Sequence, residues 1–509
     1  MKKYSATLVI ACVLFVVVPG VEVSARFARH VTITGNTKGG PPAPDFAARI
    51  ERIENGLLPA ATIKGQSIAG MNLAERMKHY NVPGVSIAFF ENGQIAWTRS
   101  YGFADVASGR RVTAETLFQS ASISKPAAAL AVLRLVQEGK LNLDEDVNLK
   151  LRSWKIPENE FTKQEKVTLR RILSHSAGMN IRRFPGYASD EALPTTLQIL
   201  NGEKPANTAP IRVDTVPGTI WRYSGGGYVT MQLLLSDVTH TAVPQLLDEM
   251  VLRPIGMTHS TFEEPLPKSL WGSAATPYRE DGKPVKGGWH NYPEITPAAL
   301  WSTPSDIARL AIEVQNEYAG KSSKILSSEM MHEMLSHQKD DWGLGFALET
   351  PGHKLRFSHG GSNEGFRCTL QAYTEAPGQG IVIMTNGDQG WNLLNEILRA
   401  VSKEYSWQDF HPQEHTLARI DVSKFSGYAG KYEVAGADKP TIITLRDSRL
   451  YVQTEALGPD PEELLAESDG HFFVVSAPLE FDFQRDDKGT VTKLNLASDF
   501  QTIVAKKVP

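Results

Sequence analysis

Residues 119–125 read QSASISK, and residues 126–141 continue as PAAALAVLRLVQEGKL. Leucine and valine recur in the second stretch at helical spacing before Gly139, which predicts a buried helix that ends at the glycine. Ser122 and Lys125 stand three residues apart at the helix start, so their side chains share one face. A serine hydroxyl needs a proton acceptor to attack an acyl carbon, and a lysine kept neutral by desolvation can be that acceptor. The stretch therefore indicates either a capped helix or a nucleophile with its base.

The S-x-x-K pattern is short, and a chain of this length should hold on the order of one or two matches by chance. A second match does occur, from Ser336 to Lys339. It lies in a polar stretch with no apolar helix behind it. The pattern at Ser122 is therefore a hypothesis that needs support from the rest of the chain.

Two glycine-rich stretches provide such support. Residues 216–235, VPGTIWRYSGGGYVTMQLLL, place Tyr223 just before three glycines and an apolar helix, where a substrate can approach the backbone closely. Residues 357–366, FSHGGSNEGF, place His359 before small residues at a strand edge, where free N–H groups can bind an oxyanion. Each stretch taken alone also fits a simpler structure: a glycine-rich helix entry in the first case and a tight turn in the second.

Length and composition describe an ordinary globular chain with more than one core. The 509 residues exceed what one core usually fills, so a large domain and a smaller one are expected. The apolar content is 41% and the charged content is 22%. A net charge of -4 offers no basic field for nucleic acid, so no nucleic-acid partner is expected.

The order of the expected elements suggests one sheet built from distant segments. A helical pattern runs from Asp45 to about Tyr80, and a hairpin follows around Asn92-Gly93. Further helices are expected near 169–173, 231–235 and 307–314, and a second hairpin over 366–386. Strands at both ends with helices between them predict a single layered α/β domain over 44–407. Alternating apolar and polar residues over 411–509 predict a separate antiparallel β domain, and closure into a barrel is left open.

The N-terminus predicts export. A basic start, an apolar stretch over 6–18, and small residues before Ala25 read as a secretory signal peptide over 1–25, followed by a flexible Pro/Gly-rich leader over 26–43. The apolar stretch is shorter than the roughly 20 residues of a membrane span. Lipoprotein anchoring at Cys12 is disfavoured because the apolar stretch continues beyond it. Cleavage would leave Cys368 alone in an apolar alternation, as a buried structural thiol. The expected localisation is periplasmic or secreted.

The combined motifs resemble the serine β-lactamase and penicillin-binding protein superfamily. The segments QSASISK, RRILSHSAGM, VPGTIWRYSGGGY, LRPIGMTHSTF, LWSTPSDIARL, WGLGF and FSHGGSNEGF occur in that family's order over about residues 70 to 400. The class C β-lactamases and the related esterases and D-amino-acid peptidases look most similar. The resemblance implies an α/β (α+β) fold, with an antiparallel sheet flanked by helices and an all-helical region inserted. It also implies a lipocalin-like C-terminal domain.

Carried over by position, the resemblance assigns roles to individual residues. Ser122 would be the acylated nucleophile, Lys125 its proton partner, and Tyr223 a base that also protonates the leaving group. The backbone N–H groups of Ser122 and Ser362 would form the oxyanion hole. His359, Gly360 and Gly361 stand where many members have Lys-Thr-Gly and would contact substrate. The resemblance implies no metal and no cofactor, and it leaves open whether Tyr223 or Lys125 is the main general base.

Two departures from the family pattern bear on the substrate. Gly225 stands where the family often has the asparagine of Tyr-x-Asn, which normally hydrogen-bonds a substrate amide. His359 replaces a lysine that helps to hold a substrate carboxylate, so this attraction should become weaker and pH-dependent. Acyl transfer should be retained, while recognition of acylamino-carboxylates such as penicillins should be reduced.

Three other functions agree less well with the sequence. An α/β-hydrolase needs a G-x-S-x-G elbow, and the segment from Gly360 to Glu364 fails at its last position. A zinc peptidase needs H-E-x-x-H, but in the segment from His332 to His337 the second histidine is one residue late. A catalytically inactive binding or regulatory protein on the same scaffold is opposed by the intact Ser122, Lys125 and Tyr223.

The sequence thus predicts an exported serine acyl-hydrolase that acts through a Ser122 acyl-enzyme. Its expected substrates are small esters, D-amino-acid peptides and, weakly, β-lactams. A true β-lactamase or DD-carboxypeptidase is the alternative. The oligomeric state, the physiological substrate and the task of the β domain are left open.

Overall fold

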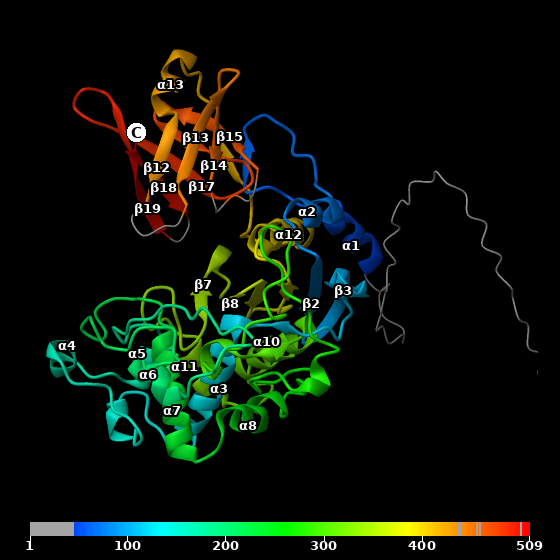
Figure 1. Ribbon diagram of the computed structural model, residues 1–509. Coiled ribbons are helices and arrows are strands. Elements are labelled where there is room, and N and C mark those ends of the chain that lie inside the picture. The colour runs from blue at the N-terminus through cyan, green and yellow to red at the C-terminus, as the bar shows by residue number, and fades with distance from the viewer. Residues whose placement is uncertain (1–44, 435–438, 455–456, 458–459, 499–500, 509) are drawn as a thin grey trace, which may run out of the picture.

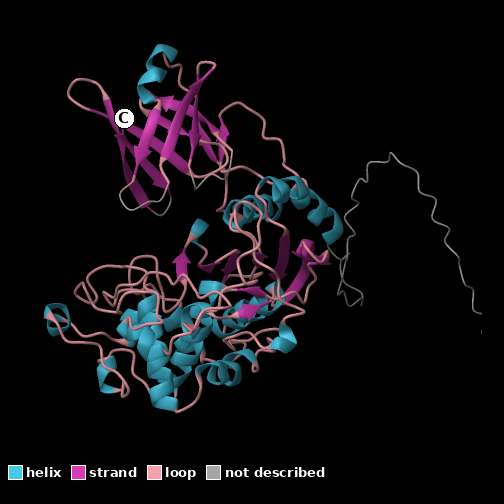
Figure 2. Ribbon diagram, viewed as in Figure 1, coloured by secondary structure: helices cyan, strands magenta, loops and turns pink. Residues whose placement is uncertain are grey.

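The computed structural model describes residues 45–434, 439–454, 457, 460–498 and 501–508 (Figure 1). The signal peptide and leader expected over 1–43, with Cys12, lie outside the described residues. The described chain forms an α/β part and a C-terminal barrel, and Figure 2 shows the mixture of helices and strands in the first and the strands of the second.

The α/β part is built on one seven-stranded antiparallel sheet, with strand order β4-β3-β2-β10-β9-β8-β7. The strands are β2 (Gly84–Glu91), β3 (Gln94–Asp105), β4 (Arg110–Arg111), β7 (Ala347–Glu349), β8 (Arg356–Asn363), β9 (Phe366–Tyr373) and β10 (Gly380–Thr385). Since β2 pairs with β10, segments from both ends of the α/β part meet at its centre. The expectation of one sheet from distant parts of the chain is confirmed.

Both faces of the sheet are covered, which explains why β2 is apolar at almost every position. Neighbouring residues of a strand point to opposite faces. Phe89 packs in the core formed with α1 (Phe46–Glu54), α2 (Leu73–His79) and α12 (Gly390–Tyr405). Phe90 packs in the core on the other side, where α10 (Pro304–Tyr318) lies against the sheet. Both side chains are fully buried.

An all-helical region lies on the α10 side, as expected. Its central element is α3 (Ser124–Gln137), which is buried along most of its length because other helices surround it. Apart from α3 and α10, the helical elements between residues 121 and 353 are η1 (Ala121–Ile123), η2 (Val147–Leu149), α4 (Glu160–Gln164), α5 (Leu169–Leu173), α6 (Thr196–Asn201), α7 (Gly225–Thr239), α8 (Val243–Leu247), η3 (Asp248–Leu252), η4 (Lys268–Leu270), α9 (Ile295–Ala298), α11 (Ser328–Met334) and η5 (Pro351–His353).

The single helical segment expected from Asp45 to about Tyr80 is wrong. The structure has two helices, α1 and α2, with the short strand β1 (Ala61–Ile63) between them. Gly56 and Pro59 follow α1, and both residue types disfavour continuation of a helix. The two helices together carry the apolar periodicity, and both contribute to the core that α12 shares with the sheet.

Both expected hairpins are present. Asn92 and Gly93 join β2 to β3 with φ values of 54° and 74°, as a two-residue hairpin turn requires. The second hairpin joins β9 to β10. The first turn is predictable because its geometry depends on its two turn residues, whereas residues 374–379 connect the second pair of strands.

The C-terminal β domain closes into an eight-stranded antiparallel barrel, which answers the question that the sequence left open. Its strands are β12 (Gly430–Glu433), β13 (Thr441–Arg446), β14 (Arg449–Gln453), β15 (Glu462–Ser468), β16 (His471–Phe473), β17 (Leu479–Arg485), β18 (Val491–Ser498) and β19 (Gln501–Val508). Closure comes from pairing of β12 with β19, and the interior has its own apolar core. The short elements η6 (Val422–Lys424) and α13 (Phe425–Tyr428) precede the barrel.

The barrel lies on the side of the sheet that α1, α2 and α12 cover (Figure 1). Strand β1 pairs in parallel with β11 (Gln413–His415), which belongs to the connection between the two parts. The backbone N–H of Ala61 also donates to the carbonyl of Val475 at 3.0 Å. The ribbon formed by β1 and β11 therefore joins the α/β part to the barrel.

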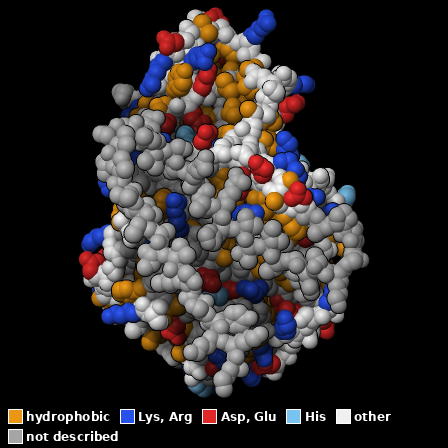
Figure 3. All heavy atoms as spheres, turned by 90° about the vertical axis from the view of Figure 1, so that its right-hand side faces the viewer, with side chains coloured by type: hydrophobic (Ala, Val, Ile, Leu, Met, Phe, Trp, Pro, Cys, Tyr) orange, Lys and Arg blue, Asp and Glu red, His pale blue; other side chains and the backbone are white. Residues whose placement is uncertain are grey.

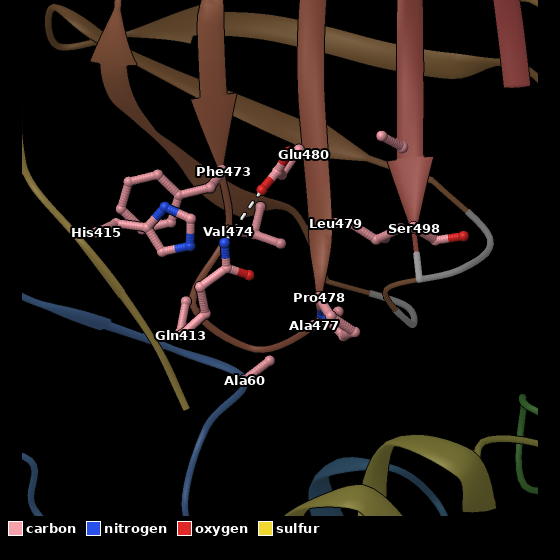
Figure 4. Close-up of a pocket in the computed structure, with 12 residues that line it drawn as sticks. Ala60, Gln413, His415, Phe473, Val474, Ala477, Pro478, Leu479, Glu480 and Ser498 are labelled. Carbon is pink, nitrogen blue, oxygen red and sulfur yellow. Dashed lines mark hydrogen bonds between the residues drawn. The ribbon is translucent and has the colours of Figure 1, made fainter. Parts of the chain in front are cut away.

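A cavity of about 120 Å³ lies where this ribbon meets the barrel end (Figure 4). His415 stacks on Phe473 there, with 4.0 Å between ring centroids, and Gln413 donates to Glu480 at 3.4 Å. None of the site residues predicted from the sequence lines this cavity.

The surface has mixed charge. On the face shown in Figure 3, the visible Lys and Arg side chains are interspersed with Asp and Glu side chains. None of the helices in the described ranges is long and apolar enough to cross a membrane.

Candidate active site

The 3₁₀ turn η1 and the paired strands β5 (Phe118–Gln119) and β6 (Trp301–Ser302) fix the backbone at the start of α3. Strand β5 pairs with β6, and the N–H of Ser120 donates to the carbonyl of Leu300 at 2.7 Å. Ala121 has a φ of 48°, an uncommon conformation for a residue with a side chain. Ser122 then lies in the 3₁₀ turn η1, and α3 itself begins at Ser124. The chain around Ser122 is therefore tightly constrained, while Ser122 keeps partial exposure among buried neighbours.

Lys125 is brought to Ser122 as the sequence predicts. Its Nζ donates to the Ser122 Oγ at 2.9 Å and to the carbonyl of Pro297 in α9 at 2.9 Å. The side chain is 2% exposed, and burial lowers its pKa to about 7. A buried lysine near neutrality can exist as a free amine, which is the form that accepts a proton.

Tyr223 completes this group of three. It precedes α7, whose N-cap residue is Ser224, and its hydroxyl forms a hydrogen bond with Ser122. The Lys125 Nζ lies 4.9 Å from the centroid of the Tyr223 ring. Burial raises the pKa of Tyr223, while the bond with Ser122 and the charges of two arginines oppose that rise. The three side chains that the sequence singled out for acyl transfer therefore share one site.

His359 differs from the expectation. It lies on β8 and is 4% exposed, and burial, with a further contribution from the charge of Lys125, lowers its pKa to about 3. The imidazole is therefore uncharged at neutral pH. The expected pH-dependent attraction between His359 and a substrate carboxylate is wrong, because the site buries the ring too deeply for it to hold a proton near pH 6.

Strand β8 passes directly against the turn that carries Ser122. A Cβ on Gly361 would lie 2.2 Å from the carbonyl oxygen of Ser120 and 2.3 Å from the Sγ of Cys368. Glycine is therefore required at this position for the two segments to approach so closely. Ser362 follows on β8, and β8 contacts η1, the turn that contains Ser122. Gly360, on the preceding position, faces the ring of Trp391.

Cys368 behaves as the sequence predicts. It is 1% exposed, its Sγ lies 3.1 Å from the carbonyl oxygen of Ser120, and burial raises its pKa. A thiol that stays protonated is a poor nucleophile. Its position next to β8 and Ser120 indicates a packing role beneath the site.

Gly225, predicted to contact substrate, is buried. A Cβ on it would lie 2.8 Å from the ring of Phe184 and 3.3 Å from the carbonyl oxygen of Arg182. The space that a longer side chain would use is therefore filled by the segment around Phe184.

His175 is a buried part of the site to which sequence reasoning assigned no role. Its Nδ1 accepts from the N–H of Ser224 at 3.1 Å, and its ring lies 4.2 Å from the ring of Tyr223, centroid to centroid. Burial, followed by the charges of Lys125 and His359, lowers its pKa well below the ordinary value. Its segment, RRILSHSAGM, supported the family resemblance, but no local pattern shows which residue a buried histidine will face.

Trp342 was missed in the same way. Its ring lies 5.0 Å from that of His175, 5.6 Å from that of His359 and 6.0 Å from that of Tyr223, between centroids. An aromatic wall therefore surrounds the Tyr223 ring and helps to exclude water from the buried side of the site.

The two competing motifs do not form sites of their own. The Ser336 hydroxyl donates to the carbonyl of Glu333 at 2.8 Å. The Nδ1 of His332 contacts the carbonyl of Ser328, and that of His337 contacts the carbonyl of Asp340. Within the described ranges, no group of three or more His, Cys, Asp or Glu side chains is arranged to hold a metal ion.

Comparison with known families divides the chain in two. Residues 71–403 match the family model described as Beta-lactamase, and residues 415–507 match a domain of unknown function, DUF3471. Protein flp of Staphylococcus aureus (strain N315) is 29% identical over 229 residues, which are 44% of this chain and 42% of that protein. The chain thus spans less than half the length of this relative. Penicillin-binding protein 4* of Bacillus subtilis (strain 168) is 21% identical over 432 residues, which are 77% of this chain and 88% of that protein.

Solved structures show the same fold. The octameric penicillin-binding protein homologue from Pyrococcus abyssi has a TM-score of 0.56 at 20% identity and covers 85% of this chain and 98% of its own. The D-amino acid amidase from Ochrobactrum anthropi SV3, complexed with L-phenylalanine, has a TM-score of 0.54 at 19% identity and covers 70% of this chain and 99% of its own. At these identities the similarity shows the fold alone.

Proposed function

Because the chain belongs to the beta-lactamase family, we propose that it is a serine acyl-hydrolase that cleaves esters or amides through a Ser122 acyl-enzyme. The observation that carries this proposal is the 2.9 Å contact between Ser122 Oγ and the Nζ of Lys125, whose pKa burial lowers to about 7. A nucleophile next to a base that is half neutral at physiological pH is the arrangement that covalent acyl transfer requires.

In the first half-reaction, the Ser122 Oγ attacks the acyl carbon while its proton passes to the neutral amine of Lys125. Lys125 serves better than Tyr223 here, because burial raises the pKa of the phenol and keeps it protonated. The Tyr223 hydroxyl, hydrogen-bonded to Ser122, then gives a proton to the leaving oxygen or nitrogen as the bond to the acyl carbon breaks. Lys125 returns its proton to Tyr223, and the acyl group stays on Ser122.

In the second half-reaction, a water molecule attacks the acyl-enzyme. One proton of the water passes to the neutral amine of Lys125 while the water oxygen forms the new bond to the acyl carbon. The bond between the acyl carbon and the Ser122 oxygen then breaks, and Lys125 returns the proton to that oxygen. The backbone N–H groups of Ser122 and Ser362 are proposed to bind the oxyanion in both steps. The packing of Gly361 against Ser120 supports this role, because it brings the two backbone segments together.

The proposed substrates are small esters and D-amino-acid peptides, with β-lactams cleaved weakly. Phe184 fills the space beside Gly225, where a longer side chain could otherwise contact an amide of the acyl group. A short acyl group needs no such contact.

The test uses the purified chain with 4-nitrophenyl acetate and butyrate and an acyl-serine fluorophosphonate probe. Ser122→Ala should abolish both hydrolysis and labelling, and mass spectrometry of a slow substrate should locate the acyl group on Ser122. Ser336→Ala, the matched control in the other S-x-x-K, should keep wild-type rates. Full activity in Ser122→Ala would overturn the proposal, and the absence of labelling in the wild type would favour a catalytically inactive binding protein.

We also propose that the protein is exported, with processing near Ala25 and a hydrolase domain over 44–407 ahead of the β domain over 411–509. The support is the sequence pattern of residues 1–25. Determination of the N-terminus of protein recovered outside the cytoplasm tests this, and an N-terminus at Met1 would contradict it.

A further inference from the structure

We propose that Arg182 and Arg183 form an anion-binding subsite beside Tyr223, so that the enzyme prefers acyl substrates bearing a carboxylate. This inference rests on the proposed acyl-hydrolase function and names its substrate class. It assigns carboxylate recognition to a loop of the helical region and not to His359 on β8, which is uncharged.

The loop that carries the arginines is fastened to the start of α7, directly after Tyr223. The Ser224 hydroxyl donates to the carbonyl of Asn180 at 2.8 Å. The N–H of Gly226 donates to the carbonyl of Ile181 at 3.0 Å, and that of Gly225 to the carbonyl of Arg182 at 3.3 Å. Three successive carbonyls of the loop are thus bound by three successive residues after Tyr223, which sets the position of the arginines relative to the site.

The backbone of this loop is strained at one residue. Ile181 has a φ of 57°, which is an outlier for a β-branched residue. Such a conformation is unfavourable and persists only where the surroundings enforce it. The glycines of α7 allow the loop to lie this close, since a Cβ on Gly226 would be 2.8 Å from the Asn180 carbonyl oxygen.

The two guanidinium groups keep their charge available. Both side chains are exposed, and within the described part of the chain neither forms an ion pair or a side-chain hydrogen bond. Their charges nevertheless reach Tyr223, where both oppose the rise of its pKa. Although residue 183 as a whole is exposed, nearby protein partly desolvates its guanidinium. This desolvation and, after it, the charges of Arg182 and Arg367 lower the pKa of Arg183.

Two other arginines of the surrounding segments already have acidic partners. Arg367 donates to the Asp388 carboxylate at 2.8 Å, and Arg279 is paired with Glu364. Arg182 and Arg183 have no such acidic partner among the described residues. A planar guanidinium binds a carboxylate through two parallel hydrogen bonds, so a carboxylate on the substrate is the ligand that matches this pair.

The experiment compares three 4-nitrophenyl esters of the same length: the adipate monoester, its neutral methyl ester, and the cationic 6-aminohexanoate. In the wild type, kcat/KM should fall in that order, and added salt should reduce the difference because the arginines are exposed. In Arg182→Gln/Arg183→Gln, the ratio of anionic to neutral kcat/KM should fall about 10- to 100-fold, the range for a lost hydrogen bond to a charged group. Arg182→Lys/Arg183→Lys should retain part of the ratio.

Arg419→Gln, at an exposed position in the connection to the barrel, is the matched control for net charge and should keep the wild-type ratio. An unchanged ratio in the double glutamine variant, or equal losses on the anionic and neutral esters, would overturn the proposal. The second outcome would mean that the arginines act only on Tyr223 or on the fold.

Failure of the proposed function gives a different result. If Ser122→Ala still cleaves these esters, the proposed Ser122 acyl-enzyme is wrong. The subsite can then be tested separately, by calorimetric titration of monomethyl adipate into Ser122→Ala and into the same variant with Arg182→Gln and Arg183→Gln. Binding that requires the arginines would support the subsite, and equal or absent binding would overturn it.

Discussion

The imidazole of His175 lies against the phenol ring of Tyr223, with 4.2 Å between their centroids and 32° between their planes. The Nδ1 of the same imidazole accepts a hydrogen bond from the N–H of Ser224 at 3.1 Å. The backbone carbonyl of His175 accepts one from the N–H of Arg222 at 2.8 Å. His175 therefore binds the backbone on both sides of Tyr223. It is a positioning residue for that phenol.

The first prediction concerns His175, whose φ is 56°. His175→Ala should lower the free energy of unfolding by about 1–3 kcal/mol, because the Ser224 N–H loses its acceptor in a buried place. It should also lower kcat by about tenfold or more with little change in KM, since small displacements of a catalytic group are costly. His175→Asn keeps an acceptor and tolerates positive φ, so it should recover part of both losses. Equal kcat in His175→Ala and the wild type would contradict a positioning role.

The second prediction concerns pH. Lys125 accepts a proton only when neutral, and burial lowers its pKa to about 7. The competent fraction is therefore about one half at pH 7 and about 1% at pH 5. For a neutral ester, kcat/KM should rise from pH 5, reach half of its maximum near pH 7 and level off above about pH 8.

Two variants check that the rise of kcat/KM with pH reflects the titration of Lys125. Lys125→Met removes the amine without burying a charge and should reduce kcat by about 10²- to 10⁴-fold. Lys64→Met, at an exposed lysine, should match the wild type. A flat profile between pH 5 and pH 8 would show that a different group accepts the proton.

The third prediction tests the contact between β8 and η1. Gly361→Ala should destabilise the protein by about 1–3 kcal/mol, because the new methyl group overlaps the Ser120 carbonyl and the Cys368 thiol. It should also impair ester hydrolysis, since either segment must shift to relieve the overlap. Urea unfolding and steady-state rates measure the two effects. Gly272→Ala, where a Cβ meets nothing within 4 Å, is the control. Wild-type stability and rate in Gly361→Ala would mean that the two segments separate without consequence.

The fourth prediction uses two buried acids outside the catalytic group. Glu294 is fully buried, and burial raises its pKa to about 8; burial, with a smaller effect of Glu294, also raises the pKa of Glu264 to about 8. Among the described residues, neither carboxyl oxygen of Glu294 has a hydrogen-bond partner. Because the folded state holds these protons more tightly than the unfolded chain, their stabilising contribution is complete below about pH 4.5 and is lost as the pH rises through about 8.

The free energy of unfolding of the wild type should therefore fall between pH 5 and pH 8. Glu294→Gln mimics the protonated form and should flatten this fall, whereas Glu115→Gln, at an exposed position, should leave it unchanged. Chemical denaturation at a series of pH values gives the slopes. A wild-type slope that Glu294→Gln does not alter would contradict the assignment.

The sequence by itself determined the parts of this protein that depend on neighbouring residues. The hairpin at Asn92-Gly93, the apolar helix after Lys125 and the alternation in the C-terminal strands follow from turn geometry and periodicity. The i, i+3 spacing of Ser122 and Lys125 also placed a nucleophile next to an amine, although Ser122 lies in a 3₁₀ turn ahead of the helix. The break between α1 and α2 was missed because their combined periodicity hid β1.

The tertiary structure alone decided the properties that depend on what surrounds a residue. Burial decides the charge states of Lys125 and His359. It lowers the pKa of Lys125 to about 7, so the amine can act as a base, and it lowers the pKa of His359 to about 3, so the imidazole is not a cation at neutral pH. The contacts of His175 with Tyr223 and of the Arg182 loop with α7 join segments that are far apart in the chain. Desolvation and charge interactions act through space and not along the chain, so no local pattern of residues contains them.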